Sequence, residues 1–238
     1  MQKIIVIPAR GGSKGIPKKN IFPLNGKPLI EYTLDVIQLA GLTDVDVAVS
    51  TDSEEIKEVV KKYNDVYIID RPPEISGDFA KTESALIHAT DYLERFLNKK
   101  YDAVVTLQAT SPFRRPDTLI DFINTYEKNK NEFDAMLSLN ENFTDYWIKS
   151  EEGVFGRLFP NAPRRRQERK PLYVENSAYY ITDTNSLRKN NSVLGTKING
   201  YIISDIEAID INEPIDILYA ESIMKKIEEG LINGWNDN

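Results

Sequence analysis

The 238-residue sequence contains no cysteine and only one histidine, His88. The absence of cysteine excludes disulfides, thiolate catalysis, zinc fingers and iron–sulfur clusters. A cage of histidines around a metal ion is impossible, and any serine–histidine–aspartate triad would have to use His88. His88 falls inside an expected helix without a hydroxyl or carboxylate partner nearby in sequence. We therefore interpret it as a half-buried helix residue.

Long apolar runs are also missing. No stretch approaches the ~18–20 apolar residues of a membrane span. The beginning, MQKIIVIPARGGSKG, lacks the longer apolar stretch and small-residue cleavage site of a signal peptide. The formal net charge is −7, which weighs against nucleic acid or an anionic membrane surface as a partner. We expect a cytoplasmic protein that binds neither.

Hydrophobic residues make up 41% of the chain, which is ample for a packed core. In the first half, short buried-strand patterns alternate with helical periodicity. Strands are expected over residues 3–8, 45–50, 65–70 and 103–108, and helices over 29–40, 54–62, 81–97 and 116–128. This alternation predicts an α/β fold, with a mostly parallel central sheet and helices on both faces.

The pattern changes after residue 134. Strands are expected over 135–139, 177–182 and 201–203, and a last helix over 214–230. Between them, residues 145–171 look irregular, with aromatic side chains and a basic cluster. We predict a single domain over residues 1–238 that contains an insertion at 136–175.

The loop at residues 9–20 carries the strongest functional signal. Ligands of parallel sheets bind at the carboxyl ends of the strands, and this loop follows the first strand directly. Its three glycines allow a ligand to approach the backbone, and its cations suit a triphosphate with about four negative charges. These residues are Gly11, Gly12 and Gly15, and Arg10, Lys14, Lys18 and Lys19. The spacing matches neither a Walker A loop nor GxGxxG. The alternative is an ordinary glycine-rich connection with solvated lysines.

Asp210 and Asn212 form a second candidate site. They stand two apart on an extended segment and so face the same side. Two oxygen ligands suit Mg²⁺, which commonly takes one or two carboxylates together with phosphate oxygens. The alternative is that Asn212 or Glu213 merely caps the helix that starts at Pro214.

Three further groups are weaker candidates. Polar residues 108–114 follow the fourth strand, although they could instead cap the next helix. Arg71 and Thr82 lie near another strand end and could contact a base, or could serve the loop and the helix cap. The basic cluster at 164–170 is typical of a solvated charge run. If it binds a ligand, one arginine that grips a substrate carboxylate is favoured over a nucleic-acid contact, because the net charge is −7.

Several motifs together resemble the cytidylyltransferases that activate nonulosonic acids, namely the acylneuraminate cytidylyltransferases (CMP-sialic acid synthetases) and their bacterial CMP-legionaminic acid relatives. The motifs are ARGGSKGIPKKN, STDS, RPPE, LQATSPFR, RRQ…EN and IDINEPID. The likeness covers residues 3 to 222. The first motif is shared with the CMP-Kdo synthetases, whereas RRQ…N narrows the likeness towards sialic-type sugars.

The resemblance implies a Rossmann-like, GT-A type nucleotidyltransferase. It would transfer CMP from CTP to the anomeric hydroxyl of a nine-carbon 2-keto acid sugar and release pyrophosphate, with Mg²⁺ as cofactor. The implied CTP-binding residues are Arg10, Gly11, Gly12, Ser13, Lys14, Lys19, Asn20, Arg71 and Thr82. The implied sugar-binding residues are Gln108, Arg166, Gln167 and Asn176.

The resemblance also assigns roles within this set. Lys19, Arg10 and Asp210 would be catalytic, with Lys19 near the α-phosphate, and Asp210 with Asn212 would hold the metal. Asn20, Arg71 and Thr82 would contact the cytidine. The insertion at 136–175 corresponds to a dimerisation arm, so the resemblance implies a homodimer whose arm reaches the partner's site.

Three positions depart from the family pattern. Asn212 stands where an aspartate is usual, Val174 where sialic acid synthetases commonly carry arginine, and Ser177 where glycine is usual. The last two changes favour an acceptor such as a diacetylated legionaminic acid over plain N-acetylneuraminate. Two alternatives remain: a CMP-Kdo synthetase, and a non-catalytic nucleotide-sugar sensor, which Asn212 would permit.

Overall fold

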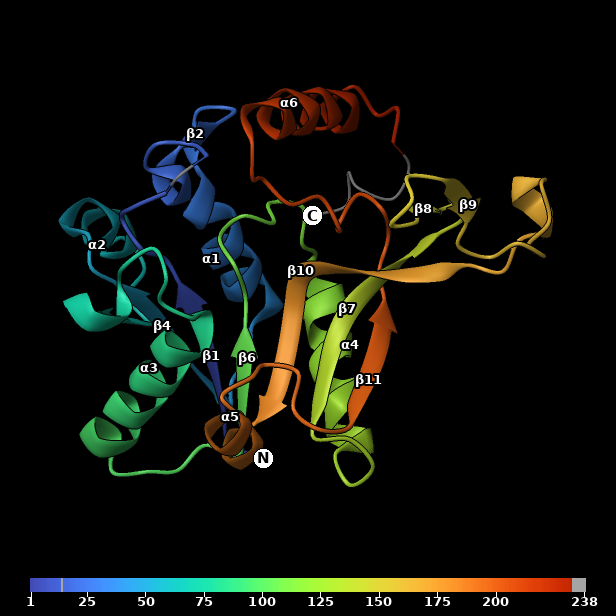
Figure 1. Ribbon diagram of the computed structural model, residues 1–238. Coiled ribbons are helices and arrows are strands. Elements are labelled where there is room, and N and C mark those ends of the chain that lie inside the picture. Colours follow the sequence, from blue (N-terminus) through green and yellow to red (C-terminus); the bar gives the residue numbers. More distant parts are fainter. Residues whose placement is uncertain (14, 233–238) are drawn as a thin grey trace.

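The computed structural model describes residues 1–13 and 15–232 (Figure 1). Lys14, one of the expected phosphate ligands, lies outside the described residues. A seven-stranded sheet in the order β11-β7-β10-β6-β1-β4-β5 forms the centre of the molecule. Its strands are β1 (Lys3–Pro8), β4 (Val45–Thr51), β5 (Val66–Asp70), β6 (Ala103–Thr106), β7 (Ala135–Asn142), β10 (Leu172–Asp183) and β11 (Ile198–Ile202). Only β10 runs antiparallel to its neighbours in this sheet, so the predicted mostly parallel sheet is confirmed.

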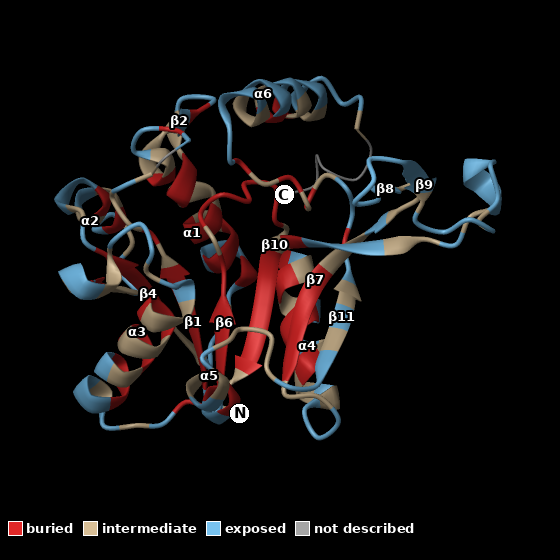
Figure 2. Cartoon of the chain, viewed as in Figure 1, coloured by how far each residue is buried: buried red, intermediate tan, exposed pale blue. Residues whose placement is uncertain are grey.

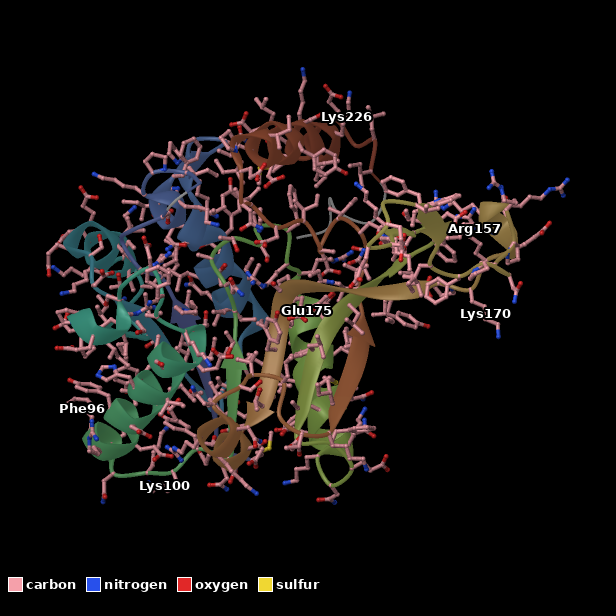
Figure 3. The ribbon with its side chains drawn as sticks, viewed as in Figure 1. Phe96, Lys100, Arg157, Lys170, Glu175 and Lys226 are labelled. Carbon is pink, nitrogen blue, oxygen red and sulfur yellow. The ribbon has the colours of Figure 1, made fainter. Side chains whose placement is uncertain are left out.

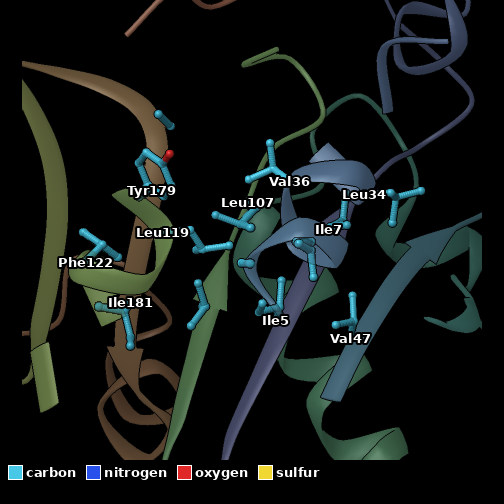
Figure 4. Close-up of a cluster of buried hydrophobic side chains, with 14 of the residues drawn as sticks. Ile5, Ile7, Leu34, Val36, Val47, Leu107, Leu119, Phe122, Tyr179 and Ile181 are labelled. Carbon is cyan, nitrogen blue, oxygen red and sulfur yellow. The ribbon is translucent and has the colours of Figure 1, made fainter. Parts of the chain in front are cut away.

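Helices cover both faces of the sheet, as predicted. They are α1 (Leu29–Ala40), α2 (Glu54–Val60), α3 (Thr82–Leu97), α4 (Pro116–Asn129), α5 (Thr184–Asn190) and α6 (Pro214–Glu228). Alternate residues of β1 point to opposite faces. Ile5 and Ile7 pack with α1 and α4 (Figure 4), whereas Ile4 and Val6 pack with α3 and α5. Burial of β1 on both faces explains its continuous apolar run.

Two elements differ from the sequence-based expectation. A small hairpin, β2 (Pro23–Leu24) with β3 (Lys27–Pro28), follows the glycine-rich loop. Its turn is Asn25-Gly26, and both residues have positive φ, as two-residue hairpin turns require. Helix α5 was also not expected from the polar sequence TNSLRKN; Asp183 caps it by accepting a hydrogen bond from the Ser186 amide.

Residues 143–171, here called the arm, project away from the sheet at one side of the molecule (Figure 1). They hold the two-stranded sheet of β8 (Trp147–Lys149) and β9 (Phe155–Arg157) and the short 3₁₀ helix η3 (Arg166–Glu168). Strands β7 and β10 continue their pairing up to the base of the arm. The segment 136–175 expected as an insertion therefore begins inside β7 and ends inside β10.

Partly exposed charge pairs hold the arm together. The Asp145 carboxylate accepts two hydrogen bonds of 3.1 Å from Nε of Arg157. Arg169 bonds the carbonyl oxygens of Phe143 and Arg164. In Figure 3, Arg157 and Lys170 lie on the arm and Glu175 lies at the bend of β10, where the arm joins the sheet. Most of the arm's surface is exposed, in contrast to the buried central strands (Figure 2).

The C-terminal part of the described chain returns over the carboxyl edge of the sheet. Helix α6 packs on the β2–β3 hairpin, in a cluster that also contains Ile16, Ile209 and Ile211. This packing brings residues 209–212 beside loop 9–20, about 200 positions away in sequence. No helix within residues 1–13 and 15–232 has the length and apolar character needed to cross a membrane.

Candidate active site

A cleft of about 390 Å³ opens at the carboxyl ends of β1, β5 and β6. This volume lies in the range of small-molecule sites. Of the residues expected from the sequence, its walls include Arg10, Ser13, Lys19, Asn20, Arg71, Thr82, Gln108 and Asn212. The structure thus collects side chains from five separate segments into one cleft. Gly11 and Gly12 belong to the same loop but do not line the cleft.

Loop 9–20 is held in place by contacts to its neighbours. The Gly11 amide donates to the Asp52 carboxylate at 2.8 Å, and Asn20 Nδ2 donates to the Arg10 carbonyl oxygen at 2.9 Å. Gly15 lies so close to Asn212 that a Cβ atom there would stand 2.5 Å from the Asn212 carbonyl oxygen. Its glycine is therefore required by close approach to a neighbouring segment.

The cations of the loop separate into two groups. Lys19 and Arg10 line the cleft, whereas Lys18 turns away and pairs with Glu55 at 2.6 Å. The expected gathering of up to four charges is therefore wrong for Lys18. The backbone of Lys18 adopts the left-handed conformation (φ 53°), which turns the chain at the start of the 3₁₀ helix η1 (Lys19–Ile21).

Arg10 and Lys19 each have a partner on the opposite wall. Arg10 Nη1 donates to the Gly77 carbonyl oxygen at 3.0 Å and pairs with Asp78 at 3.1 Å. Lys19 Nζ donates to Asn212 Oδ1 at 3.0 Å. Partial burial lowers the pKa of Lys19, and the nearby Asp210 opposes this effect. Because its charge is only partly desolvated, Lys19 is suited to meet an anion.

Arg71 forms the back of the cleft. Its Nε donates to Ser50 Oγ at 3.2 Å and its Nη2 to the Ser50 carbonyl oxygen at 2.7 Å. Burial lowers the pKa of Arg71 to about 10, which leaves the guanidinium charged at neutral pH. Thr82 begins α3 at the rim of the same cleft.

Within the described residues, Asp210 is a carboxylate whose surroundings fit a metal ligand. Its Oδ2 accepts from Asn212 Nδ2 at 2.6 Å, but its Oδ1 is buried and has no hydrogen-bond partner within residues 1–13 and 15–232. A buried bare carboxylate oxygen is costly, and a cation would satisfy it. Over the same ranges no three His, Cys, Asp or Glu side chains group as a metal site. A metal held here would therefore need oxygen atoms from a bound ligand.

Asn176 lies on β10 and does not line the cleft. Its Oδ1 accepts from Ser138 Oγ at 2.6 Å and from the Ala178 amide. Its Nδ2 is buried and finds no acceptor in the part of the chain that the structure describes. The next residue, Ser177, has φ 61°, the conformation that explains why glycine is usual there.

Gln108 is positioned by a buried arginine. Arg114 Nη2 donates to the Gln108 carbonyl oxygen at 2.7 Å, and Arg114 Nε donates to the Ala178 carbonyl oxygen at the same distance. Arg114 thereby ties the strand end that carries Gln108 to β10, which carries Asn176.

Arg166 and Gln167 are not brought to this cleft by their own chain. Both lie on η3 in the arm, at the opposite side of Figure 1 from loop 9–20. Arg166 lines a different cavity, together with Asn140, Phe143 and Tyr219. Its guanidinium stands 5.7 Å from the centre of the Phe143 ring.

Three residues near the cleft were not singled out from the sequence. Asp78 and Lys81 line it together with Thr110 of the expected segment 108–114, and Asp52 holds the Gly11 amide. Asp52 directly follows β4, a position that could have marked it. Asp78 and Lys81 sit in a loop whose path over the cleft depends on tertiary packing, and no local pattern indicates it.

Comparisons of the sequence with models of known protein families and with known proteins identify the family of the chain. A family model described as cytidylyltransferase matches residues 4–205. The chain belongs to this family. A CMP-N,N'-diacetyllegionaminic acid synthase from Legionella pneumophila is 31% identical over 240 residues, which cover 98% of this chain and 100% of that protein. This cytidylyltransferase chain therefore spans the whole length of that relative.

Two further relatives belong to the same group. An N-acylneuraminate cytidylyltransferase from Streptococcus agalactiae is 30% identical over 92% of this chain and 52% of its own length. A pseudaminic acid cytidylyltransferase from Campylobacter jejuni is 30% identical over 92% of this chain and 97% of its own length. The resemblance to the acylneuraminate cytidylyltransferases seen in the motifs is thereby confirmed.

Solved structures support the fold of the cytidylyltransferase. A CMP-2-keto-3-deoxy-manno-octonic acid synthetase complexed with CTP aligns with a TM-score of 0.65 and 17% identity, over 95% of this chain and 100% of that one. A 4-diphosphocytidyl-2C-methyl-D-erythritol synthase from Anaerococcus prevotii aligns with a TM-score of 0.64, 15% identity and coverage of 94% and 96%. At these identities the likeness concerns the fold alone, and it agrees with the Rossmann-like α/β class expected from the sequence.

Proposed function

We propose that this cytidylyltransferase transfers CMP from CTP to the anomeric hydroxyl of a nonulosonic acid and releases pyrophosphate. The observation that carries the proposal is the cleft itself. It sets the cations Arg10 and Lys19 on one wall and the bare carboxylate oxygen of Asp210 beside the opposite one. The names of the relatives, which act on legionaminic, acylneuraminic and pseudaminic acids, supply the class of acceptor.

In this proposal the cleft binds CTP along the edge of the sheet. Arg71, Thr82 and Asn20 would contact the cytidine, and Arg10, Ser13, Lys14 and Lys19 the triphosphate. The hydroxyl oxygen of the sugar attacks the α-phosphorus and its proton passes to water, while the bond to the bridging oxygen of pyrophosphate breaks and the pyrophosphate leaves. Lys19 and Arg10 would stabilise the charge that develops on the phosphate oxygens.

Mg²⁺ fits the proposal as the metal. Asp210 would hold it through Oδ1, the buried oxygen without a partner, and phosphate oxygens of CTP would complete its coordination. When bound, the ion would neutralise charge on the triphosphate and on the leaving pyrophosphate.

The acceptor would occupy the side of the cleft near β6 and β10. Gln108 lines that side, and the buried Nδ2 of Asn176 is a donor for a sugar oxygen or carboxylate. Val174 and Ser177 replace the arginine and glycine of the sialic acid pattern, which favours an acceptor of the legionaminic type.

We propose further that the enzyme is a homodimer joined through the insertion at 136–175. The arm is a single two-stranded sheet with a short helix, and such a unit is only marginally stable alone. It nevertheless exposes large apolar side chains, a pattern typical of an interface. These are Trp147, Ile148, Val154, Phe155, Leu158 and Phe159. A dimer would cover them and bring Arg166 and Gln167 to the partner's acceptor site.

The decisive experiment is an assay of pyrophosphate release. The protein is incubated with CTP, Mg²⁺ and one acceptor at a time: N-acetylneuraminate, N,N'-diacetyllegionaminate, pseudaminate or 3-deoxy-manno-octulosonate (Kdo). We expect turnover with the nine-carbon acceptors, fastest with the legionaminate. Turnover with Kdo alone would make the enzyme a CMP-Kdo synthetase. Binding of CTP without turnover of any acceptor would favour the nucleotide-sugar sensor. Sedimentation equilibrium that shows a monomer would refute the dimer.

A further inference from the structure

Asn212 stands between the two charged groups that the proposed reaction needs most. Its Oδ1 accepts from Lys19 Nζ at 3.0 Å, and its Nδ2 donates to Asp210 Oδ2 at 2.6 Å. A single amide thus links the lysine of loop 9–20 to the carboxylate proposed to hold the metal. The three residues form one continuous chain of hydrogen bonds, and Lys19 and Asn212 line the cleft.

Chemistry fixes which way this amide points. An ammonium group only donates hydrogen bonds, and an ionised carboxylate only accepts them. Turning the amide round would set Nδ2 against the Lys19 ammonium and Oδ1 against the Asp210 carboxylate, so both contacts would become repulsive. The oxygen of Asn212 must therefore face Lys19, and this contact occupies the atom that a metal would use.

Asn212 itself is held by the backbone around it. Its backbone N–H donates to Oδ2 of Asp216 at 2.8 Å, and the same carboxylate belongs to the capping box that begins α6. The neighbouring Ile211 amide donates to the Thr110 carbonyl oxygen at 2.8 Å. The side of Asn212 towards loop 9–20 is closed by Gly15. The backbone that carries the short Asn212 side chain is therefore fixed, whereas the ammonium group of Lys19 ends a long side chain with many rotamers.

We propose that Asn212 is a positioning residue for Lys19 and not a metal ligand. The amide holds the ammonium group at the mouth of the cleft without neutralising it, because an amide carries no charge. It also occupies one oxygen of Asp210 and leaves the other for the cation. An aspartate at this position would instead pair its charge with Lys19 and repel Asp210. The inference rests on the proposed function, since it assigns Lys19 to the phosphate.

A double-mutant cycle tests the inference. The enzymes compared are wild type, Asn212→Ala, Lys19→Ala and the double variant, with Asn64→Ala, on the turn before β5, as the control. A positioning residue acts only through its target. We therefore expect Asn212→Ala to lower kcat by about 10–100-fold in wild type, the scale of a misplaced catalytic group. In the Lys19→Ala background it should lower kcat by less than about twofold.

A second measurement separates positioning from metal binding. Isothermal titration of CTP over a series of Mg²⁺ concentrations gives the Mg²⁺ requirement without any turnover. We expect Asn212→Ala to leave the half-saturating Mg²⁺ concentration within about twofold of wild type, because Asp210 is intact. Asn212 is exposed, so the variant should fold normally.

Two results would overturn the inference. One is an equal loss of kcat from Asn212→Ala in both backgrounds. The other is a rise of about tenfold or more in the Mg²⁺ requirement, which a lost ligand would cause. A wild-type enzyme that releases no pyrophosphate with any acceptor would instead refute the proposed function. The two failures are thus distinguishable.

Discussion

Replacement of Gly15 by alanine should disturb both stability and catalysis. The added Cβ would lie 2.5 Å from the Asn212 carbonyl oxygen, whereas ordinary contacts begin at 3.4 Å. Loop 9–20 and residues 210–213 would have to separate by about 0.9 Å. Both segments are backbone, so no side-chain rotation relieves the clash. Overpacking of this kind costs about 1–3 kcal/mol.

The expected effects follow from that displacement. For a chain of this length, 1–3 kcal/mol corresponds to a fall in Tm of about 2–12 °C. Moving Lys19 by about 1 Å relative to the phosphate should lower turnover by about 100-fold. Thermal unfolding followed by circular dichroism and the pyrophosphate assay measure the two effects.

Gly12→Ala is the matched control for Gly15→Ala. It lies in the same loop, and a Cβ there meets no atom within 4 Å among the described residues. We expect its Tm to stay close to that of wild type. If the two variants lower Tm alike, the close contact between the loop and Asn212 does not hold the two segments in place.

Three further predictions concern single side chains. Lys19→Ala should lower turnover by about 10²–10³-fold, the scale of losing one group that stabilises transition-state charge. Lys18→Ala removes only the exposed pair with Glu55 and should change turnover little. Equal effects of the two variants would refute the different roles of the two lysines. Ser177→Gly should raise the free energy of unfolding by up to about 1 kcal/mol, because it relieves the left-handed conformation, and a lower Tm would contradict this. Burial alone would raise the pKa of Asp134, but hydrogen bonds, chiefly from Thr196, hold it well below its usual value. A carboxyl whose pKa is lower in the folded protein than in the unfolded chain stabilises the fold above the unfolded pKa, and this stabilisation is lost as pH falls. Asp134→Asn should therefore lower the free energy of unfolding at pH 7 and reduce its loss below about pH 4. Denaturant unfolding at both pH values tests this.

The sequence predicted the parts of this structure that rest on local patterns. The run at β1 is apolar because both of its faces are buried, so the strand and the loop after it could be located. The mostly parallel sheet with helices on both faces then followed from the alternation of strands and helices. The hairpin at Asn25-Gly26 carried a recognisable turn signal, but its strands have only two residues each, too few for a periodic pattern.

Many of the residues named from the sequence line the cleft, but the sequence did not predict how they meet there. Lys18 and Lys19 are equivalent in sequence, and only the backbone conformation at Lys18 sends one away from the cleft. The contact between Lys19 and Asn212 joins residues 193 positions apart, through the packing of α6 on the hairpin. Neither contact has a local signature, since both depend on how distant segments meet.

The carboxyl ends of β1, β4 and β5 are tied to one another. The Ala9 amide donates to the Ser50 carbonyl oxygen, and the Arg71 amide donates to the Thr51 carbonyl oxygen. The strand ends at the proposed nucleotide half of the cleft are thus bonded into the sheet, whereas the arm is continuous with β7 and β10. Under the proposed function, the donor site and the acceptor site would therefore rest on different parts of the fold. Substitutions in the arm would then change which sugar is accepted while the hydrogen bonds around the nucleotide stay intact.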